Sequence, residues 1–145
     1  MKLAIGSDFV GYPLKEGLKL FLISRGFEVL DCGTESTDPC DYPIFARLVA
    51  EAVAKGECDR GIVICGTGIG MSIAANKVRG IRCALCHDIF TARLARRHND
   101  ANVLALGANV VSLAHAEQIV TAWLEEEYEG GRHDPRLQMI AQMEK

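Results

Sequence analysis

A cysteine followed by three alternating glycines is the feature of this sequence best suited to chemistry. Cys65 ends the apolar run 62–65, and Gly66, Gly68 and Gly70 follow it at every second position. Alternating glycines let the backbone turn sharply and leave its N–H groups free to face negative charge. A thiol beside such donors indicates a reaction in which a proton moves while an anion develops.

Two simpler interpretations of this segment stay open from the residues alone. A cysteine at a strand end is more often a packing residue than a catalytic one, and Thr67 can simply shape the turn. The glycines also resemble a dinucleotide-binding loop, although Met71 stands where GxGxxG requires its third glycine. The dinucleotide-binding pattern also requires an acidic residue about twenty positions further on, and Asp88 stands there. The match is therefore weak rather than absent.

The other cysteines favour structural roles. Residues 83–87, Cys-Ala-Leu-Cys-His, match the c-type haem attachment pattern. That pattern implies export, for which the sequence shows no signal, and the two cysteines would point to opposite faces of the strand predicted there. Cys32, Cys40 and Cys58 lack the paired spacing of a zinc site. We therefore expect neither a metal nor a cofactor.

Composition limits the class of protein. The 145 residues are 49% hydrophobic, which is enough for a single globular domain with a full core. A net charge of −3 offers no field for nucleic acid or an acidic membrane surface, and no apolar run approaches the roughly 18 residues of a membrane helix. The chain opens on a strand-like segment rather than a signal peptide, so we expect a cytoplasmic protein with reduced cysteines.

Strand and helix patterns alternate five times along the chain. Short apolar runs predict strands at 2–6, 27–31, 61–65, 81–86 and 103–106. Apolar residues at helical spacing predict helices at 13–25, 45–53, 69–78, 88–97 and 112–128. This alternation predicts a single α/β domain over residues 1–145: a three-layer, Rossmann-like α/β/α fold with a five-stranded parallel sheet and a C-terminal helical tail.

Polar residues and the glycine loop follow the carboxyl ends of the predicted strands, where ligands of such sheets bind. Asp8 follows the first strand, Asp41 and Tyr42 follow the second, His87 and Asp88 follow the fourth, and residues 107–109 follow the fifth. The Cys65 loop follows the third strand. We therefore expect these residues to share one edge of the sheet.

Several histidines and arginines carry weaker signals. His98 ends a predicted helix, where a histidine often does no more than favour the helix dipole. Arg132 and Arg136 would share a face if helical, and could clamp a phosphate or form an ordinary surface pair. His87 and His115 have no supporting context, and we expect both to be structural.

The tail, residues 128–145, leaves the predicted core. Leu137, Ile140 and Met143 form an apolar stripe along it. One small domain does not cover such a stripe easily, so we expect the tail to dock onto another subunit.

Several segments together resemble the ribose-5-phosphate isomerase B family, in a group that also includes galactose-6-phosphate isomerase subunits. They are Asp8, Asp41-Tyr42-Pro43, the block 64–77, Gly80-Ile81-Arg82, the segment 98–103 and Gly130-Gly131-Arg132-His133. The resemblance runs nearly end to end. It implies reversible aldose–ketose isomerisation of a sugar phosphate through an enediolate, without a metal, in homodimers or dimers of dimers with shared active sites.

The resemblance also implies roles for individual residues. Cys65 would take the proton from the carbon beside the carbonyl, Thr67 would move protons at the substrate oxygens, and His98 would assist ring opening. Backbone N–H groups around Gly66, Gly68 and Gly70 would hold the enediolate charge. Asp8, Tyr42 and Asn99 would contact the sugar hydroxyls, and Arg132 and Arg136 would take the phosphate. Asp41 and Ser72 are also expected to bind the substrate.

Two positions depart from the family pattern. Phe9 stands where histidine is common, and Asn109 stands where an arginine is common. Both positions help to hold the phosphate end in the family. We therefore expect the isomerase chemistry with an altered sugar as an alternative: a tetrose or hexose phosphate, or an unphosphorylated sugar.

Two further alternatives come from other functional classes. The first is a sugar-phosphate-binding module without catalysis. The second is a phosphoacceptor receiver domain, which shares the five βα units. That domain is disfavoured because Asp8 has no adjacent acid and no lysine lies between Lys77 and Lys145.

Overall fold

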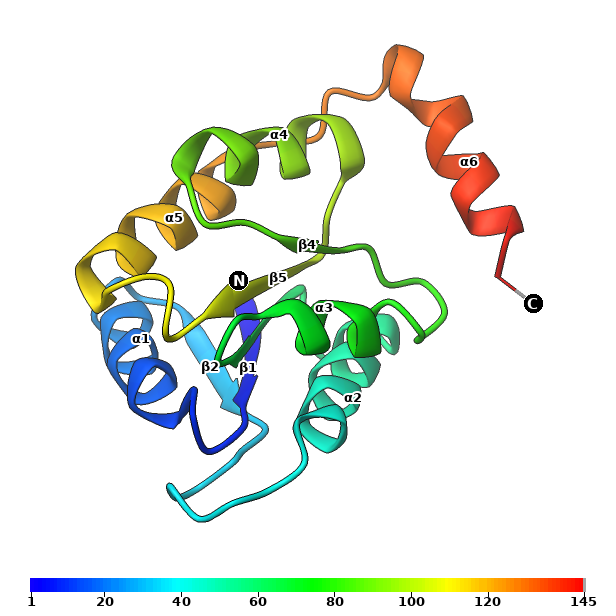
Figure 1. The fold of residues 1–145 in the computed structure, drawn as a ribbon. Helices are drawn as coiled ribbons and strands as arrows, with labels where there is room; N and C mark the ends of the chain where they lie inside the picture. The colour runs from blue at the N-terminus through cyan, green and yellow to red at the C-terminus, as the bar shows by residue number, and fades with distance from the viewer. Residues whose placement is uncertain (145) are drawn as a thin grey trace.

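The computed structural model describes residues 1–144 as one parallel sheet between two helical layers (Figure 1). The strands are β1 (Lys2–Ser7), β2 (Glu28–Asp31), β3 (Arg60–Cys65), β4 (Cys83–Leu85) and β5 (Val103–Gly107). The helices are α1 (Tyr12–Ser24), α2 (Tyr42–Ala54), α3 (Ile69–Ala75), α4 (Ile89–Asn99), α5 (Leu113–Glu125) and α6 (Asp134–Gln142), with a 3₁₀ turn η1 (Gly131–His133). The predicted α/β architecture is confirmed.

The strand order brings the ends of β1, β3 and β5 together in the middle of the sheet. The order is β2-β1-β3-β5-β4, and every neighbouring pair is parallel. Ser7 pairs with Ile64, and Cys65 pairs with Gly107. This order differs from the 2-1-3-4-5 order of flavodoxin-like receiver folds, which argues against that alternative.

Alternation along the strands divides the core into two halves. Leucines and isoleucines of β1, β3 and β5 pack against α1, α4 and α5: Leu3, Ile5, Ile62, Ile64, Leu104 and Leu106. Smaller side chains from the same strands face α2 and α3: Ala4, Val63, Cys65, Val103 and Ala105. The Cys65 side chain therefore points toward the α2–α3 layer.

Several element boundaries differ from the predicted ones. β4 has only three residues, and side chains accept the backbone N–H groups at its start. Asn102 Oδ1 accepts from the Arg82 N–H, and Asn76 Oδ1 accepts from the Cys83 N–H. α3 and α5 are also shorter than predicted. α2 begins at Tyr42 rather than Phe45, and α4 extends to Asn99.

The C-terminal helix α6 stands apart from the α/β body in Figure 1. It has no buried residue, and it returns to the body only near its end, where Glu144 Oε2 accepts from the Gly80 N–H at 2.9 Å. Ile140 and Met143 line a cleft of about 350 Å³ against the turn at 76–81. None of the helices in residues 1–144 is long and apolar enough to span a bilayer.

Candidate active site

The cysteine loop sits where β3 turns into α3. Cys65 is the last residue of β3 and only 6% exposed, and its Sγ accepts the Gly68 N–H at 3.2 Å. Gly68 has φ +78°, a conformation that suits glycine. Thr67 lies exposed at the tip, and its Oγ1 accepts from the Ile69 N–H at 3.3 Å. The Gly68 N–H thus holds the sulfur, which leaves other loop donors to face a substrate.

Asp8 is fixed beside the end of β3. Its backbone N–H donates to the Ile64 carbonyl at 3.2 Å, and its Oδ1 accepts the Gly11 N–H at 2.9 Å. The residue is only 7% exposed. Phe9 follows it and is half-buried. A buried carboxylate with a backbone donor has a fixed direction, which suits contact with a sugar hydroxyl.

Tyr42 closes over the start of α3. A Cβ on Gly70 would lie 2.5 Å from the Tyr42 ring, so position 70 must be glycine for this contact to form. Asp41 caps α2 without a side-chain hydrogen bond to it and lies exposed. The Ser72 hydroxyl already donates to the Ile69 carbonyl at 2.7 Å. The structure thus brings Tyr42 onto the glycine loop.

The end of β5 supports the same loop from the other side. Asn109 donates its N–H to the Gly66 carbonyl at 2.9 Å, and its Nδ2 would be 3.2 Å from a Cβ on Gly66. A Cβ on Gly107 would lie 2.7 Å from the Thr67 backbone. The loop therefore rests directly on this strand end.

His87 lies at the carboxyl edge, as its position after the fourth predicted strand indicates, and there it contacts the backbone of β5. Its Nε2 accepts the Gly107 N–H at 3.0 Å. β4 ends at Leu85, so it offers this N–H no backbone carbonyl as an acceptor. Only a neutral imidazole can accept this bond. Burial lowers the pKa of His87, although Asp88 opposes the shift. The bond supports the end of β5, which agrees with the structural role expected of His87.

Four predicted site residues lie at the opposite edge of the sheet. His98 and Asn99 form the last turn of α4, Arg132 lies in η1 and Arg136 near the start of α6. The Gly61 N–H donates to the Asn102 carbonyl, so the end of α4 adjoins the beginning of β3. Cys65 ends that strand, about 13 Å further along. A single chain does not bring the four residues to Cys65.

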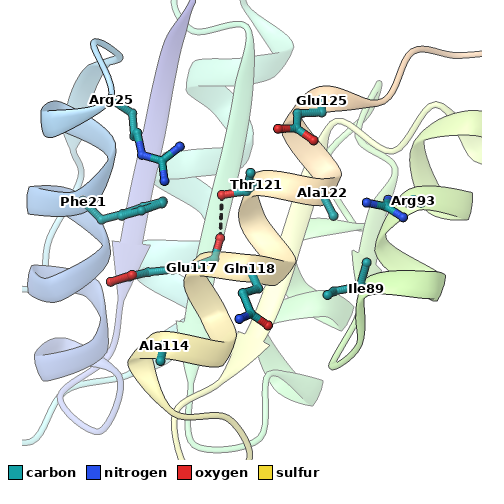
Figure 2. A pocket seen from close by; sticks show the side chains of 10 residues that line it. All are labelled: Phe21, Arg25, Ile89, Arg93, Ala114, Glu117, Gln118, Thr121, Ala122 and Glu125. Atoms are coloured by element: carbon teal, nitrogen blue, oxygen red, sulfur yellow. Dashed lines mark hydrogen bonds between the residues drawn. The ribbon is translucent and has the colours of Figure 1, made fainter.

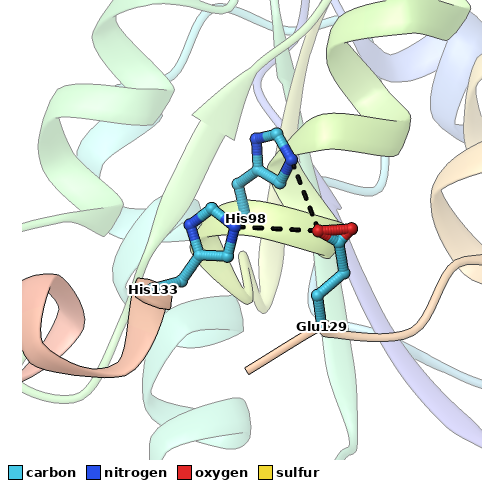
Figure 3. A group of neighbouring side chains, drawn as sticks. All are labelled: His98, Glu129 and His133. Carbon is cyan, nitrogen blue, oxygen red and sulfur yellow. Dashed lines mark ion pairs between the residues drawn. The ribbon is translucent and has the colours of Figure 1, made fainter. Parts of the chain in front are cut away.

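Two histidines and a glutamate form a compact group at this second edge (Figure 3). The rings of His98 and His133 stack with centroids 4.4 Å apart. Glu129 Oε1 lies 3.6 Å from Nε2 of His98 and 3.7 Å from Nε2 of His133. Burial, followed by the neighbouring His98 and Arg132, lowers the pKa of His133. Sequence reasoning quoted His133 without a role and missed Glu129.

The same three side chains are of the types that bind transition metals, but their geometry fits a cation poorly. The rings are inclined by only 18°, so their in-plane lone pairs run side by side instead of converging on one point. Arg132 and Arg136 add positive charge beside His133. The stacked rings and the nearby arginines therefore suit an anion and an exchangeable proton better than a metal ion.

A surface groove lies on another part of the molecule. Figure 2 shows it between α1, α4 and α5, with a volume of about 390 Å³. Phe21, Arg25 and Glu117 are among its lining residues, and none of the predicted site residues is. We therefore take the carboxyl edge, where the polar groups converge, as the candidate active site.

Comparison with known proteins points to one family. The sequence profile described as Ribose/Galactose Isomerase matches residues 3–140. Ribose-5-phosphate isomerase B of Escherichia coli (strain K12) is 53% identical, covering 99% of this chain and 96% of that protein. D-erythrulose-4-phosphate isomerase of Pectobacterium atrosepticum is 43% identical, with 99% and 95% covered.

A solved structure agrees with these relatives. That of Clostridium thermocellum ribose-5-phosphate isomerase B has a TM-score of 0.98 and 57% identity to this chain, covering 99% of this chain and 97% of that one. A match of this length includes both edges of the sheet and the tail. The chain belongs to the ribose/galactose isomerase family and is an aldose–ketose isomerase, as its sequence predicted.

Proposed function

We propose that this chain interconverts ribose 5-phosphate and ribulose 5-phosphate through an enediolate, with Cys65 as the base. One observation carries the proposal: Cys65 Sγ is held by the Gly68 N–H, at the strand end that also adjoins Asp8 and the Thr67 loop. Two relatives at 53% and 57% identity are named ribose-5-phosphate isomerase B, which supports ribose 5-phosphate as the substrate.

The proposed reaction moves one proton between two carbons. Cys65 takes the proton from C2 of the open-chain aldose, the carbonyl oxygen becomes an enediolate oxygen, and the proton returns at C1. A carbon acid is too weak to lose its proton to a thiolate unless the developing oxyanion is stabilised. One preorganised hydrogen-bond donor lowers the barrier to such a step by about 3–4 kcal/mol. Loop N–H groups around Gly66 and Gly70 would supply the donors, and the Thr67 hydroxyl would relay protons between the two oxygens.

The proposed complete site needs two chains. His98, Asn99, Arg132 and Arg136 lie at the edge opposite to Cys65, so those of a second copy would supply ring opening and phosphate binding. α6 supports this arrangement because it leaves the body with Met143 76% exposed, ready to pack on a partner. A homodimer, alone or paired into a tetramer, is therefore proposed.

The six cysteines support a proposed cytoplasmic location. All of them are free thiols in the structure. The base mechanism itself requires a reduced Cys65, which a reducing compartment maintains.

Deuterium incorporation tests the proposed chemistry. Ribulose 5-phosphate is incubated with the protein in D₂O, and the C1 position is followed by NMR. We expect deuterium at C1 together with formation of ribose 5-phosphate. Absence of both, with folded protein, would contradict the proposal.

A shorter or longer sugar is the second candidate. Phe9 follows Asp8 at the carboxyl edge, and Asn109 lies against Gly66. Phe9 supplies no polar group and Asn109 supplies only an uncharged amide, where histidine and arginine are common in the family, and one relative is named D-erythrulose-4-phosphate isomerase. The test is kcat/KM for tetrose, pentose and hexose phosphates and for an unphosphorylated pentose, repeated with Phe9→His and Asn109→Arg. A preference for ribose 5-phosphate that the two changes do not increase would reject this candidate.

A further inference from the structure

Glu129 is anchored to the last turn of α4 in a way that aims its carboxylate at the two stacked histidines. Its backbone N–H donates to the Arg97 carbonyl at 3.0 Å. Its Oε2 faces Arg97 Nε at 3.5 Å, while Oε1 faces both imidazoles (Figure 3). The two oxygens therefore have separate partners, and Oε1 is the one available to His98.

His133 is buried and stacks against the ring of His98. It is 6% exposed, and its Nε2 is buried without a hydrogen bond among residues 1–144. The parallel stack, 4.4 Å between centroids, restricts rotation of the His98 ring. Burial, followed by the neighbouring His98 and Arg132, lowers the pKa of His133 although Glu129 opposes the shift, so His133 takes up a proton less readily than a free histidine.

These contacts fix both the plane of the His98 ring and the nitrogen that faces Glu129. A carboxylate beside one imidazole nitrogen holds the proton there and leaves the other nitrogen free to accept one. The side chain of His98 is 32% exposed, so part of the ring remains open to a ligand.

We infer that Glu129 is a positioning residue for His98, holding the proton on Nε2 so that Nδ1 faces the sugar; this inference rests on the proposed function. Nδ1 then takes the proton of the anomeric hydroxyl as the bond from C1 to the ring oxygen breaks. The resulting imidazolium is stabilised by the Glu129 carboxylate, and it gives the same proton to the ring oxygen. The C1 aldehyde is the product, and no proton is gained or lost.

The test separates ring opening from enolisation. Ribulose 5-phosphate has its C5 oxygen phosphorylated and cannot close to a furanose, so deuterium exchange at its C1 needs no ring step. Glu129→Gln is compared with Glu126→Gln, which removes a neighbouring carboxylate that faces Arg93 and Arg97 instead of an imidazole. For Glu129→Gln we expect isomerisation of ribose 5-phosphate to fall about 10- to 100-fold, with C1 exchange within about 2-fold of wild type.

The tautomer supplies a second readout that a merely structural role would not change. In ¹⁵N-histidine spectra, His98 should carry its proton on Nε2 in the wild type and in Glu126→Gln, and lose that preference in Glu129→Gln. Equal isomerisation by the two variants, or equal losses of isomerisation and exchange in Glu129→Gln, would overturn the inference. Absence of exchange in the wild type would instead reject the proposed function itself.

Discussion

The two edges of the sheet are built in different ways. At the carboxyl edge, Cys65 and Asp8 are 6% and 7% exposed and are held by backbone N–H groups at 3.2 and 2.9 Å. At the other edge, Arg132 and Arg136 are exposed, and Glu129 meets its histidines only at ion-pair distances.

This difference matches the demands of the two proposed tasks, proton transfer at carbon and phosphate binding. Proton transfer at carbon depends on placement to within a fraction of an ångström, which buried backbone supplies. Phosphate binding depends mainly on charge, which long surface side chains supply. In the proposed division of the reaction, each edge forms a complete site with its counterpart on another chain.

The largest effect is expected at the carboxyl edge. Cys65→Ser should lower both isomerisation and C1 exchange by about 10³-fold or more, because the base serves both steps. Cys40→Ser, in the loop before α2, is the matched control and should retain wild-type rates. Initial rates and NMR exchange check this prediction, and a Cys65→Ser variant with near-normal exchange would assign the base elsewhere.

A smaller and more selective effect is expected at the other edge. His98→Asn should lower isomerisation of ribose 5-phosphate by about 10²-fold and leave C1 exchange of ribulose 5-phosphate nearly intact. The contrast with Cys65→Ser in the same two assays is the measurement. Parallel losses in both assays would mean that the two edges do not divide the reaction as proposed.

Packing beneath the loop gives the third prediction. Gly107→Ala places a methyl group 2.7 Å from the Thr67 backbone, which cannot rotate away, so it should cost about 1–3 kcal/mol of unfolding free energy and lower kcat. Gly17→Ala meets only the flexible Leu113 side chain and serves as the control. Urea denaturation and kcat measure both variants; equal losses would show that the loop tolerates displacement.

The smallest effect is expected from His87. Removing its bond to the Gly107 N–H in His87→Ala should cost about 1 kcal/mol at pH 8. Burial lowers the folded-state pKa of His87 from 6.5, so the unfolded chain binds more protons. Its contribution is therefore complete above about pH 6.5 and is lost as the pH falls through the lowered value. Denaturation of wild type and variant from pH 5 to 8 should show the difference shrinking; a constant difference would contradict the acceptor role.

The carboxyl edge was largely predictable from the sequence because local patterns determine it. Apolar runs ended by Asp8 and Cys65 gave the strands, and parallel strands share one edge. The hydrogen bond from the Gly107 N–H to His87 was not predicted, because it forms beyond the short β4, whose start is bonded to the side chains of Asn76 and Asn102. Those bonds join residues that sequence periodicity does not relate.

The second edge was less predictable. His98 and Arg132 were identified only through family resemblance, since their spacing alone fits a helix end and a surface pair. Their separation from Cys65 follows from the direction of α4, which runs back from the carboxyl edge. Glu129 lies in an irregular segment between α5 and η1, where no periodic pattern marks a functional side chain.

Mixed dimers test the division between the two edges most directly. Cys65→Ala and His98→Asn chains carrying different affinity tags are co-expressed, and the doubly tagged dimer is isolated and assayed with ribose 5-phosphate. The shared-site account predicts one intact site per mixed dimer, hence about half of the wild-type activity, although each parent homodimer is impaired. A mixed dimer no more active than its parents would show that Cys65 and His98 of different chains do not form one site.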